Sequence, residues 1–187
     1  MAIFASGKGS NAANIIRYFD GHPSISVGLI VCNNANAGVI EIAKKNRVPV
    51  LLINRQSLDN PKECLAALQQ AGMEYLVLAG FLWKLPPPII EAFPNKILNI
   101  HPALLPQYGG KGMYGQHVHE AVIAAKESQS GITIHIVDEH YDKGDIVFQA
   151  ACTIDAADTP ERLAAKIHAL EQVHFPKVIE QYLQNQR

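Results

Sequence analysis

The sequence has few cysteines, few aromatic residues and almost no net charge. Cys32, Cys64 and Cys152 lie far apart and form no C-x-x-C pair, so we expect free, buried thiols rather than a disulfide framework. Sixteen basic residues against seventeen acidic ones give a formal net charge of -1, which provides no general attraction for nucleic acid or for an anionic membrane. Any phosphate that the protein binds must therefore be held locally.

Long hydrophobic runs are also lacking. The longest apolar stretches, such as residues 75–82, fall well short of the roughly 20 residues needed to cross a bilayer. Residues 1–5 predict a strand followed at once by a glycine turn, which is unlike a secretory leader. We therefore expect a cytoplasmic protein. With 48% hydrophobic residues in a chain of 187, one core can close, and we predict a single domain spanning residues 1–187.

Short apolar runs alternate with longer stretches of helical periodicity, which is typical of successive βαβ units. We expect strands at 2–5, 25–32, 48–53, 74–79 and 96–100, and helices at 11–19, 38–46, 61–71 and 86–93. A Pro/Gly-rich loop, 102–115, precedes a helix at 116–127, two β-branched runs at 131–137 and 145–153, and a last helix at 160–183. The fold class is α/β, a doubly wound, mostly parallel, Rossmann-like sheet with helices on both faces and a C-terminal antiparallel hairpin.

The turn between the first strand and the first helix has the composition of a phosphate site. Gly7 and Gly9 let the backbone approach an anion, Lys8 adds a positive charge, and Ser10 and Asn11 can cap the helix or donate to phosphate oxygens. A tight turn without any ligand is the simpler alternative, and it stays open at this point.

The same turn also matches the loose dinucleotide pattern Gly7-x-Gly9-x-x-Ala12, which is weak evidence by itself. A nicotinamide or flavin enzyme needs a ribose-binding carboxylate at the end of the second strand, where this chain has Cys32 followed by two asparagines. The Walker pattern fails because no Gly-Lys-Ser/Thr follows a four-residue gap. A single phosphate is therefore the more economical ligand.

Asn99 and His101 stand at the carboxyl end of the fifth predicted strand, where alternation places them on the same side. An amide and an imidazole beside a long loop indicate a catalytic position rather than a structural histidine. His117 and His119 suggest a metal pair, but no further ligand completes a set, so we expect no metal. His135 alternates with Thr133 on a strand and either faces the site or plays a structural role.

Three segments together resemble the folate-dependent formyltransferases. The segment Asn99–Pro106 matches their N-x-H-P-(S/A)-L-L-P signature, Leu78–Phe81 resembles their folate-pocket strand end, and Asp138–Gly144 resembles their D-E-x-x-D-x-G loop. The likeness runs from the first strand to the last helix. It implies direct transfer of the formyl group of the co-substrate 10-formyltetrahydrofolate to the amine of 5′-phosphoribosylglycinamide, with these two small molecules as partners and a monomer or homodimer as the assembly.

The resemblance also implies roles for individual residues. The catalytic trio would be Asn99, His101 and Asp142, and Thr133 stands where the family has a hydroxyl near the reaction centre. The ribonucleotide would be bound by Gly7, Lys8, Gly9, Ser10, Asn11 and Glu171, with Lys96 as an additional phosphate contact. The folate would be bound by Phe81, Leu82, Trp83, Leu85, Asp138, Glu139, His140 and Tyr141, where Trp83 departs from the charged or smaller residue common in the family.

Relatives with the same chemistry deliver formyl to initiator methionyl-tRNA or to water. A tRNA formylase is expected to carry an additional RNA-binding domain and a basic face, and a hydrolase an N-terminal regulatory domain. Neither expectation fits this chain, which leaves the ribonucleotide as acceptor. A non-catalytic nucleotide-binding module would explain the glycine turn but not the Asn99, His101 and Asp142 arrangement.

Overall fold

The computed structural model describes residues 1–186, which divide into two compact units, Met1–Leu98 and the part from Asn99 onward. Across these residues the strand order is β3-β2-β1-β4-β5-β6-β7. The strands of the first unit pair in parallel, β1 with β2 and β4, and β2 with β3, whereas β6 and β7 are antiparallel. The predicted α/β class with a mostly parallel sheet and a C-terminal hairpin is confirmed. The single domain spanning 1–187 stays a prediction, and Arg187 lies outside the described residues.

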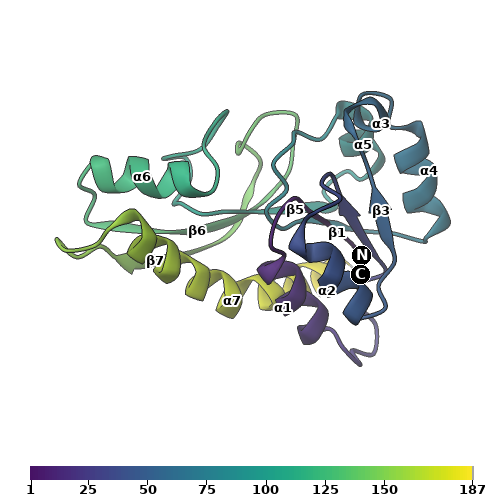
Figure 1. Ribbon diagram of the computed structural model, residues 1–187, viewed down its shortest axis with the longest axis horizontal. Helices are drawn as coiled ribbons and strands as arrows, with labels where there is room; N and C mark the ends of the chain where they lie inside the picture. Colours follow the sequence, from purple (N-terminus) through teal and green to yellow (C-terminus); the bar gives the residue numbers. More distant parts are fainter. Residues whose placement is uncertain (187) are drawn as a thin grey trace. The chain divides into compact units, whose positions relative to one another are not determined.

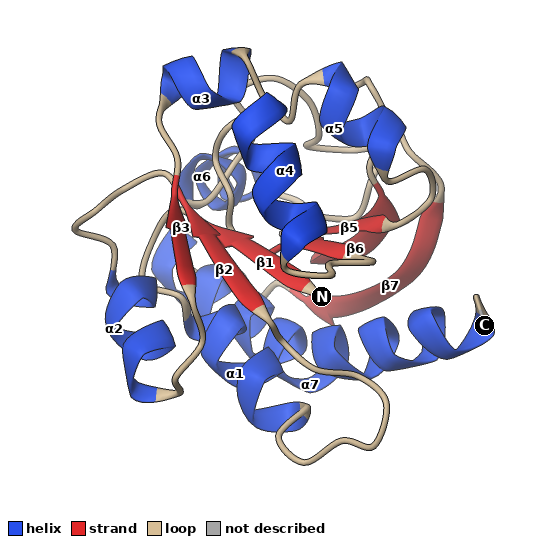
Figure 2. Cartoon of the chain, turned by 90° about the vertical axis from the view of Figure 1, so that its right-hand side faces the viewer, coloured by secondary structure: helices blue, strands red, loops and turns tan. Residues whose placement is uncertain are grey.

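The first unit is a doubly wound parallel arrangement. Its strands are β1 (Ala2–Ala5), β2 (Leu29–Cys32), β3 (Val50–Leu52) and β4 (Leu76–Leu78), and its helices are α1 (Ser10–Tyr18), α2 (Gly38–Lys45), α3 (Arg55–Asp59), α4 (Lys62–Gln70) and α5 (Pro87–Ala92). Figure 2 shows α1 and α2 on one side of β1–β3 and α4 on the other. Every residue of β1, β2 and β4 is buried, as strands covered on both faces require.

The sequence-based predictions were wrong on two local points in this unit: the start of one strand and the absence of one short helix. The strand predicted at 25–32 begins only at Leu29, where its pairing with β1 starts at Ala2; before that, Gly28 N donates to Met1 O and the Met1 amine donates to Ser26 O without forming a ladder. The short helix α3 was not predicted. It is held by a capping box, in which the Asn54 side chain accepts from Ser57 N and the Ser57 hydroxyl accepts from Asn54 N, each at 2.8 Å.

The second unit consists of the end of β5 (Ile97–His101), α6 (Gln116–Ala124), β6 (Gln129–Ile136), β7 (Ile146–Thr153) and α7 (Pro160–Asn185). Helix α7 packs along both strands of the hairpin, as Figure 1 shows. Its start follows the sequence prediction, since Thr159 is the N-cap, accepts a hydrogen bond from Arg162 N and precedes a proline in the first turn. Ile132, Ile134 and Phe175 are fully buried and form part of the core.

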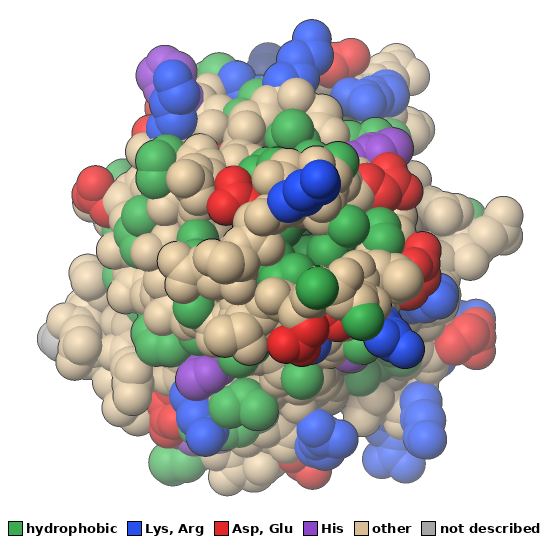
Figure 3. All heavy atoms as spheres, turned by 90° about the vertical axis from the view of Figure 1, so that its left-hand side faces the viewer, with side chains coloured by type: hydrophobic (Ala, Val, Ile, Leu, Met, Phe, Trp, Pro, Cys, Tyr) green, Lys and Arg blue, Asp and Glu red, His purple; other side chains and the backbone are tan. Residues whose placement is uncertain are grey.

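The surface carries both signs of charge. On the face shown in Figure 3, lysine and arginine side chains are interspersed with aspartate and glutamate. Within residues 1–186, no helix is both long enough and apolar enough to pass through a bilayer.

Replacement of Gly9 should destabilise the fold for both steric and conformational reasons. It is the N-cap of α1 with φ 80°, and a Cβ there would lie 2.7 Å from Val39 Cβ and 2.8 Å from Val39 Cα. A left-handed alanine costs about 1–2 kcal/mol, so we expect Gly9→Ala to lower the Tm by about 2–8 °C. Gly7→Ala is the matched control, because nothing lies within 4 Å of its Cβ position. Equal Tm values for the two variants in thermal denaturation would contradict this.

Candidate functional site

The turn after β1 leads directly into α1. The helix begins at Ser10, and no side chain makes a capping hydrogen bond to its first turn, which is the arrangement at which helix N-termini bind anions in other proteins. Lys8 and Ser10 are exposed beside it, and Asn11 is buried. Val39 N donates to Gly7 O at 3.2 Å, which fixes the turn against the start of α2. The predicted phosphate-binding residues 7–11 therefore lie together in one turn.

A second loop of the first unit is tied to this turn. Ser6 N donates to Gly80 O at 3.0 Å, and Leu82 N donates to Ser6 Oγ at 3.0 Å. These loops follow β1 and β4, the neighbouring strands between which the strand order reverses. Ligands of doubly wound sheets bind outside the carboxyl ends of strands at such a switch point. The Gly7–Asn11 turn and the predicted folate segment starting at Phe81 thus meet at one edge.

The predicted folate residues of this unit differ in exposure. Leu82 is 53% exposed, whereas Leu85 is buried and belongs to the core. The Phe81 ring packs edge-on against Phe4, with ring centroids 5.3 Å apart. Trp83 carries the guanidinium of Arg55 over its ring at 4.2 Å. A basic group therefore stands at this position although the sequence has no basic residue at 83 itself.

Lys96 is placed away from the phosphate turn. It directly precedes β5, and its carbonyl accepts from Leu76 N at 2.8 Å, at the amino end of β4. The turn lies at the carboxyl end of β1, which runs parallel to β4. The Nζ of Lys96 lies over the Tyr75 ring at 5.7 Å. We therefore leave Lys96 out of the proposed phosphate site.

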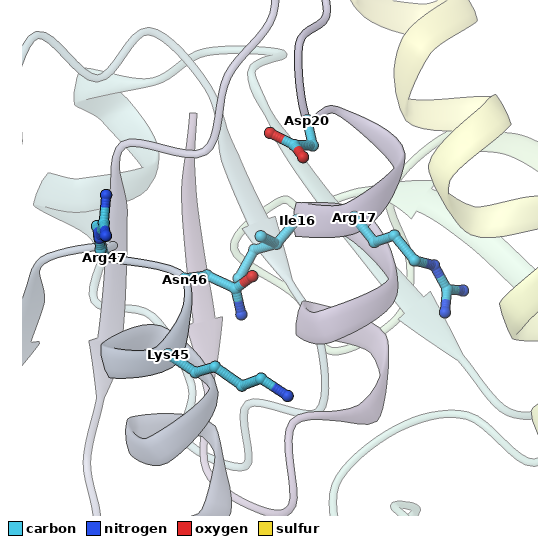
Figure 4. A pocket seen from close by; sticks show the side chains of 6 residues that line it. All are labelled: Ile16, Arg17, Asp20, Lys45, Asn46 and Arg47. Atoms are coloured by element: carbon cyan, nitrogen blue, oxygen red, sulfur yellow. The ribbon is translucent and has the colours of Figure 1, made fainter.

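An open depression of about 350 Å³ lies between α1 and α2, lined by Ile16, Arg17, Asp20, Lys45, Asn46 and Arg47. In Figure 4 the Arg17 side chain points away from the other basic side chains, and its Nη2 donates to Asn14 Oδ1 at 2.6 Å. The basic residues stand at or just after the ends of the two helices, where cations offset the helix dipoles. We assign this depression no role in substrate binding.

The predicted catalytic trio meets in the second unit. His101, at the end of β5, directs Nδ1 toward Asp142 Oδ2 at 3.6 Å, and its Nε2 lies 2.8 Å from the carbonyl oxygen of Tyr108. Because a carbonyl only accepts, Nε2 carries a proton. Gly110 N donates to Asp142 Oδ2 at 2.8 Å. The loop after β5 thus supplies one partner to the imidazole and another to the carboxylate.

His135 joins the trio as a fourth member that the sequence alone left undecided. It is 2% exposed, and its Nδ1 donates to Ile136 O at 2.9 Å. Its Nε2 lies 3.1 Å from Asn99 Nδ2 and 3.5 Å from Asp142 Oδ1. The shorter contact makes Nε2 the acceptor of an Asn99 N–H. His135 therefore orients the Asn99 amide, and alternation with Thr133 on β6 was the only sequence signal for it.

Burial and charge set the protonation of the trio. Burial lowers the pKa of His101 below its ordinary 6.5, and the opposing effects of Asp142 and the Tyr108 carbonyl only partly offset this. Burial acts to raise the pKa of Asp142, but the His135 ring, the Gly110 N–H and the positive charge of His101 bring it below 3.8. At neutral pH the pair is therefore a neutral imidazole facing an ionised carboxylate.

Thr133 anchors the loop after β5 rather than facing a reaction centre. Its hydroxyl donates to Ala103 O at 2.7 Å and accepts from Leu105 N at 3.0 Å and from Gln149 Nε2 at 2.8 Å. All hydrogen-bonding capacity of the hydroxyl is used within the fold. The loop that carries Tyr108 and Gly110 is thereby fastened to the hairpin.

The remaining predicted residues of the second unit lie on the hairpin loop and on α7. Glu139, His140 and Tyr141 are exposed and Asp138 is half-buried, with its carboxylate accepting from His140 N at 2.7 Å. Glu171 lies on α7, where its Oε2 is 3.4 Å from His168 Nδ1. Asp142 itself has φ 54°, a left-handed conformation that persists only when its surroundings enforce it.

In the described part of the chain, no group of three or more His, Cys, Asp or Glu side chains could hold a metal ion. His119 is buried, and its Nδ1 has no hydrogen-bond partner. The three cysteines are free, and burial raises the pKa of Cys64 to about 11, so this thiol is unreactive at neutral pH.

Residues 1–179 match the family described as formyl transferase. The chain belongs to the formyl transferase family.

Relatives of this formyl transferase include chloroplastic phosphoribosylglycinamide formyltransferase of Arabidopsis thaliana, 42% identical, with 96% of this chain and 63% of the relative covered. The chain spans 59% of the corresponding Vigna unguiculata protein, so it covers less than two thirds of both plant relatives. The Bacillus subtilis enzyme of the same name is 38% identical, with 97% and 93% covered. The crystal structure of the Bacillus halodurans enzyme is similar with a TM-score of 0.90 and 34% identity, covering 100% of this chain and 96% of that one.

The lowered pKa of His101 predicts how stability depends on pH. Below pH 6.5 the unfolded chain binds a proton at this histidine that the folded protein resists, so folding stability falls as the pH falls. One such group contributes a slope of up to about 1.4 kcal/mol per pH unit. Asp142 is lowered below 3.8 and stays ionised in this window.

We therefore expect His101→Asn to flatten the dependence of the unfolding free energy on pH between about 6.5 and 5, measured by urea denaturation. His140→Asn, at an exposed histidine of the same unit, is the matched control. A His101→Asn slope identical to that of the unsubstituted protein would show that burial of this imidazole does not set the acid sensitivity.

Proposed function

We propose that this protein transfers the formyl group of 10-formyltetrahydrofolate directly to the amine of 5′-phosphoribosylglycinamide. The observation that carries the proposal is the convergence of Asn99, His101 and Asp142, with His101 Nδ1 3.6 Å from Asp142 Oδ2. The named relatives and the anion-accepting turn at Gly9 support the same substrates. The cytoplasmic location and the monomeric or dimeric state stay predictions.

The chemistry requires donors aimed at one oxygen. Formyl transfer to an amine passes through a tetrahedral carbon whose oxygen gathers negative charge, and preorganised N–H groups stabilise that charge. The Nδ2 of Asn99 has two hydrogens, and its bond to His135 uses one of them. The other can be donated to the oxygen. Because β5 and β6 fix both partners, the amide needs no reorientation during the reaction.

His101 supplies the second donor, and Asp142 accepts the proton that the attacking nitrogen loses. The Nε2–H of His101 is a donor in this structure, bound to the Tyr108 carbonyl, and the oxyanion would take over as its acceptor. Asp142 is ionised and faces Nδ1 of the same ring, so it favours the imidazolium and can accept, directly or through a water, the proton that the attacking nitrogen loses. An amine is nucleophilic once deprotonated, so no side chain needs to carry the formyl group.

The ribonucleotide is preferred over other acceptors for its phosphate. The turn from Gly7 to Asn11 offers amides at the start of α1 and the charge of Lys8 to one compact anion. The family resemblance implies that Glu171 on α7 binds the same ribonucleotide. Transfer to water would not require this turn, and a tRNA acceptor would require a basic surface, whereas the formal net charge of this chain is -1.

The first test is absorbance-monitored turnover of a 10-formylfolate donor. We expect turnover with glycinamide ribonucleotide and none with the donor alone or with methionyl-tRNA. His101→Ala should lower kcat on the order of 10²-fold or more, because it removes an oxyanion donor. Donor consumption without an acceptor would mean a hydrolase, and no consumption under any condition would favour a binding module.

Arg55 and Trp83 provide a test of the folate site. If the guanidinium over Trp83 meets the glutamate tail, Trp83→Leu removes its platform and should raise the KM for the donor about 2- to 5-fold, the value of an exposed cation–π contact. The kcat should stay unchanged. Arg55→Ala should raise the KM more for a triglutamate donor than for a monoglutamate. An equal change for both donors would exclude a contact with the tail.

A further inference from the structure

Tyr108 has a geometry that its place in a Pro/Gly-rich loop does not explain. Its φ is 55°, a left-handed conformation that is unusual for a bulky residue. Its carbonyl oxygen accepts the His101 Nε2–H at 2.8 Å, and its hydroxyl donates to Glu127 Oε1 at 2.7 Å. Glu127 lies between the end of α6 and the start of β6, outside the loop itself. One residue thus connects a distant carboxylate to the catalytic imidazole.

The tautomer of His101 depends on this carbonyl. The carboxylate of Asp142 faces Nδ1 at 3.6 Å, and by itself it would favour a proton on Nδ1, because the Nδ1–H could then donate to it. A neutral ring in that form has no proton on Nε2 and cannot donate from this atom. The Tyr108 carbonyl has the opposite preference, since it requires a proton on Nε2.

The side chain of Tyr108 is what keeps the carbonyl in place. A left-handed tyrosine is strained and persists only where its surroundings enforce it. The hydrogen bond to Glu127 is a short, charge-assisted one, and it acts on the one residue whose carbonyl reaches His101. Glu127 also raises the pKa of the Tyr108 hydroxyl above 10, so the hydroxyl remains a donor at any working pH.

We propose that the hydrogen bond between Tyr108 and Glu127 is a positioning device for catalysis, which holds the Tyr108 carbonyl against His101 and keeps the ring in its Nε2–H tautomer. The inference rests on the proposed function for its kinetic consequence, because Nε2–H is the donor that the oxyanion needs. Its structural consequence, the position of a proton on a histidine of the free protein, does not.

The decisive experiment is nitrogen-15 NMR of the histidine rings in the free protein at pH 8, where His101 is neutral because its pKa lies below 6.5. His101→Asn identifies the signals. The unsubstituted protein should show the proton on Nε2, and Tyr108→Phe should shift the ring toward the Nδ1–H form. The kcat of Tyr108→Phe should fall about 2- to 10-fold, the value of one neutral hydrogen bond, with an unchanged KM.

Four further variants separate positioning from folding. Glu127→Gln retains an acceptor and should keep the tautomer and kcat, whereas Glu127→Ala should reproduce Tyr108→Phe, and the double variant should lose no more than either single one. Tyr114→Phe in the same loop is the matched control, since Tyr114 is exposed and its ring only packs against His117. A tautomer unchanged in Tyr108→Phe would overturn the proposal. A shifted tautomer in a protein that transfers no formyl group would support the device and reject the function.

Discussion

The site depends on one constraint, which is that the ionised carboxylate of Asp142 must be held where water largely cannot reach it. Its side chain is only 11% exposed, and a buried charge requires donors and opposite charge around it. Gly110 N donates to Oδ2 at 2.8 Å, and the His101 and His135 rings lie 3.6 Å and 3.5 Å from the carboxylate oxygens. The loop after β5, the end of β5 and strand β6 therefore come together around this one carboxylate.

The loop after β5 approaches Asp142 closely at Gly109. A Cβ at Gly109 would lie 2.5 Å from Leu105 Cδ2 and 3.3 Å from Asp142 Cβ, so a larger residue here would require the Leu105 side chain and Asp142 to shift. The Thr133 hydroxyl then fixes the base of the loop through Ala103 and Leu105. This packing and these hydrogen bonds leave the proposed catalytic groups few alternative arrangements, and such preorganisation is what stabilisation of a developing oxyanion would require.

The first unit contains the residues that we propose for binding anionic and flat ligands, in a chain without a general positive charge. The start of α1 is the proposed anion site, and Ser6 ties the segment after β4 to the same turn through Gly80 O and Leu82 N. The charge over Trp83 comes from Arg55, a residue of the short helix α3. Local dipoles and single cations thus replace the basic surface that the composition lacks.

Sequence alone determined the features that depend on neighbours along the chain. The order of most strands and helices, the glycine turn, the Thr159 cap, and the placement of Asn99 and His101 at one strand end follow from periodicity and local chemistry, because these act over a few residues.

The tertiary structure alone decided the features that depend on distant residues. The ends of β2 follow from its partner strand, and the positions of Lys96 and Leu85 depend on the direction of parallel strands and on burial. The roles of His135, Thr133 and Tyr108 arise from contacts across 19 to 36 residues of chain. A local sequence pattern does not predict such contacts, because a hydrogen bond between distant segments forms only when the chain folds.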